Sequence, residues 1–483
     1  MKQEEGIPVT AVFDIGKTNK KFLLFDERYR VVFQNSTELD QTTDDDGDSC
    51  EDLEQLVHWI GKQFENVTGN EDYRVEKLNF STYGATLVHL DKEGQPVTPL
   101  YNYLKDYPEP LQQKFYDQYG GQSQFSIETA SPPMGMLNSG LQLYWLKYRK
   151  QEQFKKINHT LHFPQYLSYL FTDKVHSELT SIGCHTGMWN FRENGYHRWL
   201  EAERMLGLLP DIKPVGATYP PVGTDLDIQI GNGIHDSSAA LAPYLIALED
   251  PFLLVSTGTW SISFNPFNTD PLTFEELKRD CLCYMNIYGE QVKASRLFLG
   301  KEYMHQKRRL ESHFNRESTA SAPELDPGLL RSLINEGNPA KRLQLEQAYG
   351  SGPYPQKEAG NWKLNSFESY QEAYHQLMLD LVSIQTDCIG LVEGEQKLNK
   401  LIVTGGFSQN KFYMKMLASA FPGKKVYTAS LSNASALGAA LVINDPESFG
   451  KDAQKELLDL TLHTPLQDTG IEEYRWKSSA ERI

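Results

Sequence analysis

The chain opens with an apolar run that ends on an acid, followed by a short polar turn and a second apolar run. Val12 and Phe13 lead into Asp14, the turn covers residues 16–19, and residues 22–25 are apolar again. This pattern predicts two antiparallel strands joined by a tight turn, with Asp14 at the mouth of the turn. It is not a glycine-rich nucleotide loop of the G-x-x-x-x-G-K type, because that spacing is absent and no helix is predicted after the turn.

The turn carries groups that can hold a phosphate and a metal ion. Asp14 can bind Mg²⁺, because this ion takes one or two carboxylates together with phosphate oxygens. Gly16 lets the backbone approach a phosphate closely, and Lys17, Thr18 and Asn19 can face its oxygens. An ordinary β-hairpin with a polar turn is the alternative, and this stretch alone does not separate the two.

The same design recurs far downstream. Residues 252–255 are apolar, a small polar turn is centred on Gly258, and a strand-like run follows in which Ile262 and Phe264 are apolar. An internal repeat of one strand–turn–strand unit predicts two related domains. We place them at residues 1–243 and 244–483.

Two segments of the first half carry candidate ligand contacts. A short strand at residues 77–81 runs into a small-residue turn at Gly84 and Ala85, and α/β proteins place ligand contacts at such strand ends. A plain strand-to-loop turn is the alternative. Residues 99–106 are rich in aromatic side chains and end on Asp106, a mixture that suits sugar binding and equally suits a half-buried surface strand.

Asp236 follows a glycine-containing loop at residues 228–235 and opens a helix-like run of small residues. Two roles are consistent with this position. As a helix N-cap, its carboxylate would accept a backbone N–H. As a general base, it would take a proton from a substrate, helped by His235 beside it. The sequence leaves both roles open.

Residues 398–410 combine a strand, a glycine pair and the start of a helix. Gly405 and Gly406 let a flat, bulky group lie against the backbone, and Asn410 can bond the edge of that group. A glycine pair alone is weak evidence for such a site. A helix of small residues follows at 433–441, where close helix packing is expected.

The composition narrows the function classes. The chain of 483 residues has a formal net charge of −17, which argues against a nucleic-acid or anionic-membrane binder. No apolar run approaches a membrane span, and the first residues lack the apolar core of a signal peptide. Five cysteines in so long a chain do not make a disulfide scaffold, and we interpret them as reduced, structural residues. A cytoplasmic protein is predicted.

Taken together, these motifs resemble the FGGY family of carbohydrate kinases, in the actin-like ATPase (ribonuclease-H-like) superfamily. The resemblance covers nearly the whole chain, from Val9 to about Leu441. It implies an α/β protein of two actin-like domains with a cleft between them. It also implies that residues 14–19 form a first phosphate motif and that residues 256–261 form a second.

The resemblance assigns roles to single residues. Asp236 matches the catalytic base of the family, and Gly84 falls at a sugar-contacting turn. The nucleotide-binding residues that it implies are Asp14, Gly16, Lys17, Thr18, Asn19, Lys21, Gly258, Thr259, Gly405, Gly406 and Asn410. The sugar-binding residues that it implies are Gly84, Ala85, Asp106, His235, Asp236 and Ser237. Asp14 is the implied ligand of Mg²⁺.

Within the family, the motifs are most similar to those of rhamnulokinases, with fuculokinases close by. The first loop departs from them, because Lys17, Lys20 and Lys21 stand where rhamnulokinases commonly have small residues followed by Gly-Arg. The last small-residue helix opens with Asn433 rather than the usual glutamate. These departures affect the identity of the sugar more than the class of reaction.

The expected activity is ATP- and Mg²⁺-dependent phosphorylation of a hydroxyl of a small sugar, a ketose such as L-rhamnulose or L-fuculose. Asp236 would take the hydroxyl proton, and closure of the two domains would exclude water. Two alternatives remain, an actin- or chaperone-type ATPase and a sugar-sensing kinase-like protein without kinase activity. The expected partners are the sugar and ATP, with no nucleic acid and no membrane. A homodimer is common in the family, and the sequence leaves the oligomeric state open.

Overall fold

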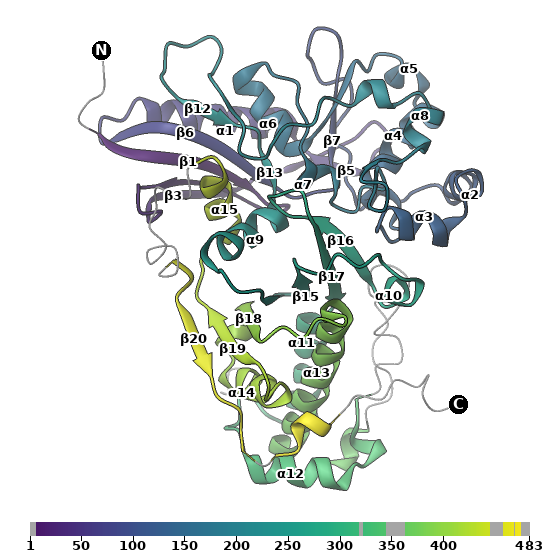
Figure 1. The fold of residues 1–483 in the computed structure, drawn as a ribbon, viewed down its shortest axis with the longest axis vertical. Helices are drawn as coiled ribbons and strands as arrows, with labels where there is room; N and C mark the ends of the chain where they lie inside the picture. Colours follow the sequence, from purple (N-terminus) through teal and green to yellow (C-terminus); the bar gives the residue numbers. More distant parts are fainter. Residues whose placement is uncertain (1–5, 318–321, 344–362, 445–456, 468, 475–483) are drawn as a thin grey trace. The chain divides into compact units, whose positions relative to one another are not determined.

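The computed structural model describes residues 6–317, 322–343, 363–444, 457–467 and 469–474. The chain divides into two compact units (Figure 1). Unit 1 comprises Met1–Glu249, Cys283–Gln291 and Ser432–Leu458, and unit 2 comprises Asp250–Leu282, Val292–Leu431 and Asp459–Ile483. Unit 1 therefore takes two segments from the second half of the sequence. The predicted division between residues 243 and 244 stays a prediction.

Unit 1 is built on a mixed sheet with the strand order β11-β12-β6-β1-β2-β3. Strands β1, β2 and β3 form an antiparallel meander, while β6 and β12 run parallel to β1 and to each other. A short strand, β13, pairs with the end of β6. The bounds are β1 Ile7–Ile15, β2 Asn19–Phe25, β3 Val31–Glu38, β6 Tyr73–Thr82, β11 Thr218–Tyr219, β12 Gln229–Gly231 and β13 Ile234–His235.

The second sheet has the order β16-β17-β15-β14-β18-β19-β20 and repeats the same plan. Strands β14, β15 and β17 are antiparallel, β18 and β19 are parallel to β14, and the last strand is antiparallel, as in unit 1. The predicted internal repeat is therefore confirmed. The bounds are β14 Leu253–Thr257, β15 Ser261–Asn265, β16 Cys281–Met285, β17 Gln291–Leu297, β18 Lys400–Gly405, β19 Lys425–Ala429 and β20 Leu460–His463.

Helices accompany both sheets (Figure 1). Those of unit 1 with seven or more residues are α1 Leu53–Thr68, α2 Glu109–Gln118, α3 Gln122–Glu128, α4 Ser139–Arg149, α6 Phe163–Thr172, α9 Asp236–Ala247 and α15 Ala434–Val442. Those of unit 2 are α11 Leu299–His313, α12 Pro327–Glu336, α13 Tyr370–Glu393 and α14 Lys411–Ala420, and the shorter α10 covers Phe274–Lys278.

The first strands form because their apolar residues bury on both faces of the sheet. Phe13 of β1 stacks on Phe22 of β2 and on Phe80 of β6, with ring centroids 4.5 and 5.9 Å apart. Helix α1 begins at a side-chain cap, where the Gln55 N–H donates to Asp52 Oδ1 at 2.9 Å. The ring contacts pack β1 against both neighbouring strands and thereby define the position of Asp14 near its end.

Helices α9 and α15 approach each other closely because both consist largely of small residues. A Cβ atom placed on Gly438 of α15 would lie 1.8 Å from the carbonyl oxygen of Ala239 on α9. Only a glycine permits this approach. The close helix packing predicted for residues 433–441 is thus confirmed, and it joins the late helix α15 to unit 1.

We expect Gly438→Ala to destabilise the protein by roughly 1–3 kcal/mol, because the methyl group would force the two helices apart. The matched control is Gly61→Ala in α1 of the same unit, where nothing lies within 4 Å of the added Cβ. That substitution should be neutral or stabilising by up to about 1 kcal/mol. Thermal unfolding of both variants measures the difference, and equal midpoints would contradict the packing described.

Candidate functional site

Three strand ends meet at one edge of the sheet in unit 1. In the parallel registers of β6, Ser81 pairs with Asp14 of β1 on one side and with Ile234 of β13 on the other. Asp236 follows β13 directly. Carboxyl ends of parallel strands are where α/β proteins bind ligands. The sheet therefore brings the predicted metal ligand and the predicted base to the same edge.

Asp14 is a carboxylate in a nearly buried position, with 9% of its surface exposed. Burial raises its pKa to about 6, and the charge of Asp236 adds to this, while the Ser435 hydroxyl, Lys21 and Ser81 oppose it. Ser435 Oγ, on α15, donates to Asp14 Oδ2 at 2.9 Å. A buried carboxylate beside a second carboxylate disfavours the ionised form, and a divalent cation would relieve this by neutralising the negative charge.

Asp236 is not a helix cap. Helix α9 begins at Asp236, its N-cap residue is His235, and the cap makes no side-chain hydrogen bond. The capping role considered from the sequence is therefore wrong. The Asp236 side chain is 34% exposed, and its Oδ1 accepts a hydrogen bond from Ser237 Oγ at 3.1 Å. Burial raises the pKa of Asp236 to about 6, and the hydrogen bonds from Ser237 oppose this shift. At neutral pH the carboxylate is ionised and able to accept a proton.

His235 lies against Asp236, with its Nε2 atom 3.3 Å from Asp236 Oδ1. The ring is buried and stacks on Tyr284 at a centroid distance of 5.8 Å. Burial lowers the pKa of His235 to about 3, so the imidazole is neutral.

The turn at Gly84 packs against this histidine. A Cβ atom on Gly84 would lie 3.0 Å from the His235 ring and 2.7 Å from Cys184 Sγ. Ala85 has a positive φ of 59°, which is uncommon for a residue with a side chain. Its carbonyl accepts a hydrogen bond from Gln142 Nε2 at 2.7 Å. Gly84, Ala85, His235 and Asp236 are therefore brought together.

The lysines of the first turn have different surroundings. Lys17 Nζ lies 3.9 Å from Glu51 Oε2 and over the rings of Tyr83 and Tyr103, at 5.3 and 5.0 Å. Burial lowers the pKa of Lys17, and Glu51 opposes this shift. Lys20, which the sequence-based assignment left out, is buried in an ion pair with Glu51. The Lys17 ammonium is thus held beside Tyr83, the neighbour of the Gly84 turn.

The rest of the first turn is more open. Lys21 Nζ donates to Asn433 Oδ1 at 3.0 Å, which ties the turn to the start of α15. Thr18 and Asn19 are exposed, and the Gly16 N–H donates to the Asn19 carbonyl at 3.0 Å. Their side chains are accessible to a ligand.

Unit 2 holds a pocket of about 520 Å³ at the second turn. The backbone N–H groups of Gly300 and Lys301, in the first turn of α11, both donate to the Thr259 carbonyl at 3.2 and 3.3 Å. These two N–H groups are therefore already bonded, and the helix dipole is what favours an anion at this end of α11. The lining residues are Gly258, Thr259, Gly300, Lys301, Tyr303, Met304, His305, Arg308, Gly406, Phe407 and Asn410.

The basic side chains of this pocket were missed in the sequence. Lys301, His305 and Arg308 recur at helical spacing on one face of α11 and line the pocket, and these described lining residues include no carboxylate. A net positive lining in a chain of charge −17 marks a site for an anion. The helical spacing of the three residues was the available signal.

The two glycines of the pair, Gly405 and Gly406, have different structural roles. Gly405 has a φ of +84°, and a Cβ atom there would lie 1.9 Å from the Thr257 carbonyl, so this glycine is required by the adjoining strand. Gly406 lines the pocket, and a Cβ atom there would meet nothing within 4 Å. Asn410 also lines the pocket, and its Oδ1 accepts the Tyr413 N–H at 3.1 Å as the cap of α14.

Within the described ranges, the structure gives no contact that ties Asp106 to the site. It is exposed, and among the described residues it makes no hydrogen bond or ion pair with Asp14, Gly84 or Asp236. Its assignment as a sugar ligand stays a prediction.

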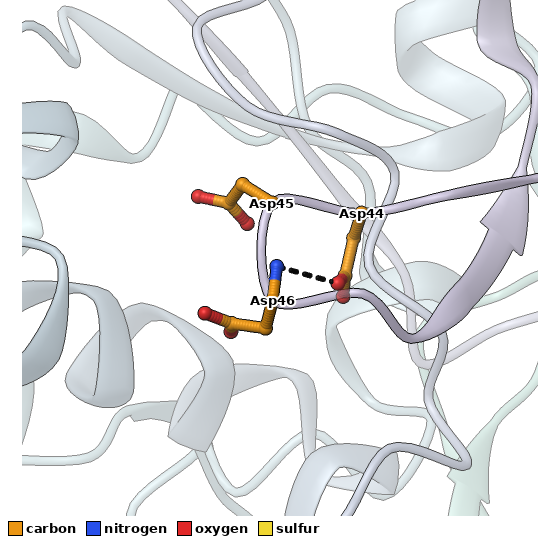
Figure 2. A group of neighbouring side chains, drawn as sticks. All are labelled: Asp44, Asp45 and Asp46. Carbon is orange, nitrogen blue, oxygen red and sulfur yellow. Dashed lines mark hydrogen bonds between the residues drawn. The ribbon is translucent and has the colours of Figure 1, made fainter.

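Figure 2 shows the one group of three side chains within the described ranges whose carboxylates lie close enough together to hold a metal ion, Asp44, Asp45 and Asp46. Lys105 Nζ lies 2.7 Å from Asp44 Oδ2 and 2.9 Å from Asp46 Oδ2. Lys150 also pairs with Asp45, at 3.0 Å. The ammonium groups neutralise this cluster, so we assign it no metal.

Every helix in the described part of the chain is too short or too polar to cross a lipid bilayer.

Comparisons with known proteins place both halves in one family. Residues 9–223 match the N-terminal domain of the FGGY family of carbohydrate kinases, and residues 249–452 match the C-terminal domain of carbohydrate kinase FGGY. The chain is 22% identical to a gluconokinase of Bacillus subtilis (strain 168) over 499 aligned positions, covering 96% of this chain and 92% of that protein.

Two solved structures share the fold. One is a carbohydrate kinase from Novosphingobium aromaticivorans, with a TM-score of 0.77, 23% identity and coverage of 95% of this chain and 97% of that one. The other is a ligand-bound xylulose kinase from Lactobacillus acidophilus, with a TM-score of 0.77, 15% identity and coverage of 97% and 96%. The predicted fold of two actin-like α/β domains is confirmed.

The open space at Gly406 gives a test of the pocket. We expect Gly406→Ala to fold as the wild type does but to bind ATP more weakly, because the methyl group would occupy the pocket wall. Calorimetric titration with ATP measures the affinity, and thermal unfolding reports folding. Gly423→Ala is the matched control, since its added Cβ also meets nothing within 4 Å and Gly423 does not line the pocket. Unchanged ATP affinity in Gly406→Ala would contradict a nucleotide in this pocket.

Proposed function

This chain belongs to the FGGY family of carbohydrate kinases, and on that premise we propose that Asp236 is the general base of its phosphoryl transfer from ATP to a sugar hydroxyl. The observation that carries this proposal is the position of the Asp236 carboxylate, which caps no helix, is partly exposed and lies beside Asp14 and the Gly84 turn. A pKa of about 6 leaves it ionised at neutral pH and still basic enough to accept a proton.

Unit 2 supplies the nucleotide contacts in this proposal. The adenosine lies along Gly406 and Asn410, and the phosphates lie near Gly258, Thr259 and the N-terminus of α11. Lys301 and Arg308, which line the same pocket, stabilise the negative charge of the phosphates. Phosphoryl transfer depends mainly on positioning and charge stabilisation, so such groups contribute much of the rate enhancement.

Unit 1 supplies the acceptor and metal contacts. Asp14 would hold Mg²⁺, and its near-buried carboxylate beside a second carboxylate fits that role. When bound, the ion neutralises charge on the phosphate oxygens. His235, Ser237 and the turn at Gly84 orient the sugar toward Asp236.

The acceptor sugar is the open part of the proposal. The motif resemblance to rhamnulokinases and fuculokinases favours a ketose such as L-rhamnulose or L-fuculose, but the comparisons support the FGGY family and not that finer assignment. The relatives described above carry other names, a gluconokinase and a xylulose kinase, so gluconate and D-xylulose are candidate acceptors as well. The cytoplasmic location and the homodimer stay predictions.

We expect Asp236→Asn to lower the turnover number for sugar phosphorylation by ~10²–10⁴-fold, because the amide cannot accept the hydroxyl proton. Sugar-dependent ADP release measures turnover, and thermal unfolding verifies that the variant folds. Asp225→Asn, at an exposed aspartate of the same unit, is the matched control. Near-wild-type turnover of Asp236→Asn would rule out the assigned base.

A further inference from the structure

A small cavity lies next to the Gly84 turn of unit 1. Its volume is about 10 Å³, which is the space that one water molecule or one hydroxyl oxygen fills. Gly84, Thr86, His162, Ser181 and His235 are among the residues that line it, and all of them belong to unit 1. Thr86 and His162 have no role in the function proposed above.

Two polar atoms of the cavity lining are buried without a hydrogen-bond partner in the described part of the chain. They are Thr86 Oγ1 and His162 Nε2. Thr86 is 2% exposed and His162 is 5% exposed, so bulk water does not solvate them. Buried polar atoms are nearly always hydrogen-bonded, because an unpaired one loses its hydration and gains nothing in return. The two atoms therefore indicate that a polar ligand group fills the cavity.

The fold holds the two side chains together at one end of a two-stranded sheet. Thr86 directly precedes β7 Leu87–Leu90, and His162 is the last residue of β8 His159–His162. The two strands pair in antiparallel fashion, and the Phe163 N–H donates to the Thr86 carbonyl at 3.2 Å. The start of β7 thus lies beside the end of β8, so one ligand group can contact both side chains.

The cavity opens at the turn where the sugar is expected. Of the lining residues that the structure describes, Gly84 is the partly exposed one, and the others are buried. His235 forms another part of the wall, and Asp236 follows it with a side chain that is 34% exposed. A Cβ atom on Gly84 would lie 3.0 Å from the His235 ring, so a side chain there would crowd the opening.

A hydroxyl group suits these partners better than an ion or a methyl group does. A hydroxyl both donates and accepts, so it can bond Thr86 Oγ1 and His162 Nε2 whichever nitrogen of the ring carries the hydrogen. A methyl group would leave both atoms unpaired. An ion would lose its hydration in this buried space and would gain no opposite charge from either partner.

We propose that this cavity is a subsite of the acceptor site and binds one non-reacting hydroxyl group of the sugar, hydrogen-bonded to Thr86 and His162. The proposal rests on the proposed sugar kinase function and narrows its substrate class. The preferred acceptor carries a hydroxyl at the position that enters the cavity, and the analogue that is deoxygenated there is a poor substrate. A water molecule takes the same place when the sugar is absent.

A matched pair of variants tests the subsite. Thr86→Val keeps the shape of threonine and lacks the hydroxyl, while Thr86→Ser keeps the hydroxyl. Both are assayed with the best acceptor of the wild type and with its analogues that each lack one non-reacting hydroxyl. We expect one analogue to have a kcat/KM at least about tenfold below that of the parent sugar in the wild type and in Thr86→Ser. In Thr86→Val this difference should fall below about threefold, because the lost hydroxyl no longer has its partner. His162→Phe removes the second partner and should give the same pattern.

Calorimetric titration with the same sugars measures binding without turnover, and thermal unfolding verifies that the variants fold. We expect Thr86→Val to bind the parent sugar at least about tenfold more weakly than Thr86→Ser does. The same effect of each deoxygenation in all the proteins, or equal sugar affinities in the two Thr86 variants, would mean that the cavity holds a structural water only and would overturn the proposal. Binding in the expected pattern without phosphorylation would refute the proposed function and support the subsite. A wild type that neither binds nor phosphorylates any sugar would refute both.

Discussion

The parallel pairing of β6 with β1 and β13 is the constraint on which the site in unit 1 depends. Ser81 is the shared partner of Asp14 and Ile234, and Asp236 follows two residues after Ile234. The two registers therefore set the positions of the Asp14 and Asp236 carboxylates together. A shift of β1 by one residue would turn Asp14 to the opposite face of the sheet. The stacked rings of Phe13, Phe22 and Phe80 oppose such a shift, because they would lose their contacts. The position of Asp14 therefore depends on the core packing of the strand that carries it.

Local charge, and not the net charge of the chain, determines what each site attracts. The chain carries a net charge of −17, yet the described lining of the unit 2 pocket has Lys301 and Arg308 and no carboxylate. In unit 1 the opposite holds, since burial raises the pKa of both Asp14 and Asp236, and the charge of Asp236 adds to the shift of Asp14. In the proposed function, a few side chains of each unit would form a site for phosphates and a site for a cation and a proton acceptor. This division of roles is consistent with ATP-dependent phosphoryl transfer.

Much of the fold could be predicted from the sequence because its signals are local. The two strand–turn–strand motifs predicted the repeat, and the small residues at 433–441 predicted close helix packing. The partner of that helix could not be predicted, because the contact of Gly438 with Ala239 joins distant parts of the chain. The sequence did not decide whether Asp236 is a helix cap or a general base, because helix boundaries predicted from sequence are uncertain by a residue or two.

The candidate site was predictable to a smaller extent. Gly84 and Gly406 could be predicted because each is a glycine that directly follows a predicted strand, and this pattern is visible in the sequence. The orientation of Lys17 toward Glu51 and two tyrosine rings depends on tertiary contacts that no local pattern encodes. The basic residues of α11 recur at helical spacing in the sequence. Their place in the pocket could not be predicted, because it depends on the contact between the start of α11 and the Thr259 turn.

The most direct test of the central claim is the product of the reaction. ADP release and phosphorylated sugar are measured together, with ATP and Mg²⁺, over L-rhamnulose, L-fuculose, D-xylulose, L-ribulose, gluconate and glycerol. We expect ADP release to depend on one or a few of these acceptors and to match the phosphorylated sugar one to one. ADP release that is the same with and without every acceptor, and no phosphorylated sugar, would contradict the assignment of a sugar kinase.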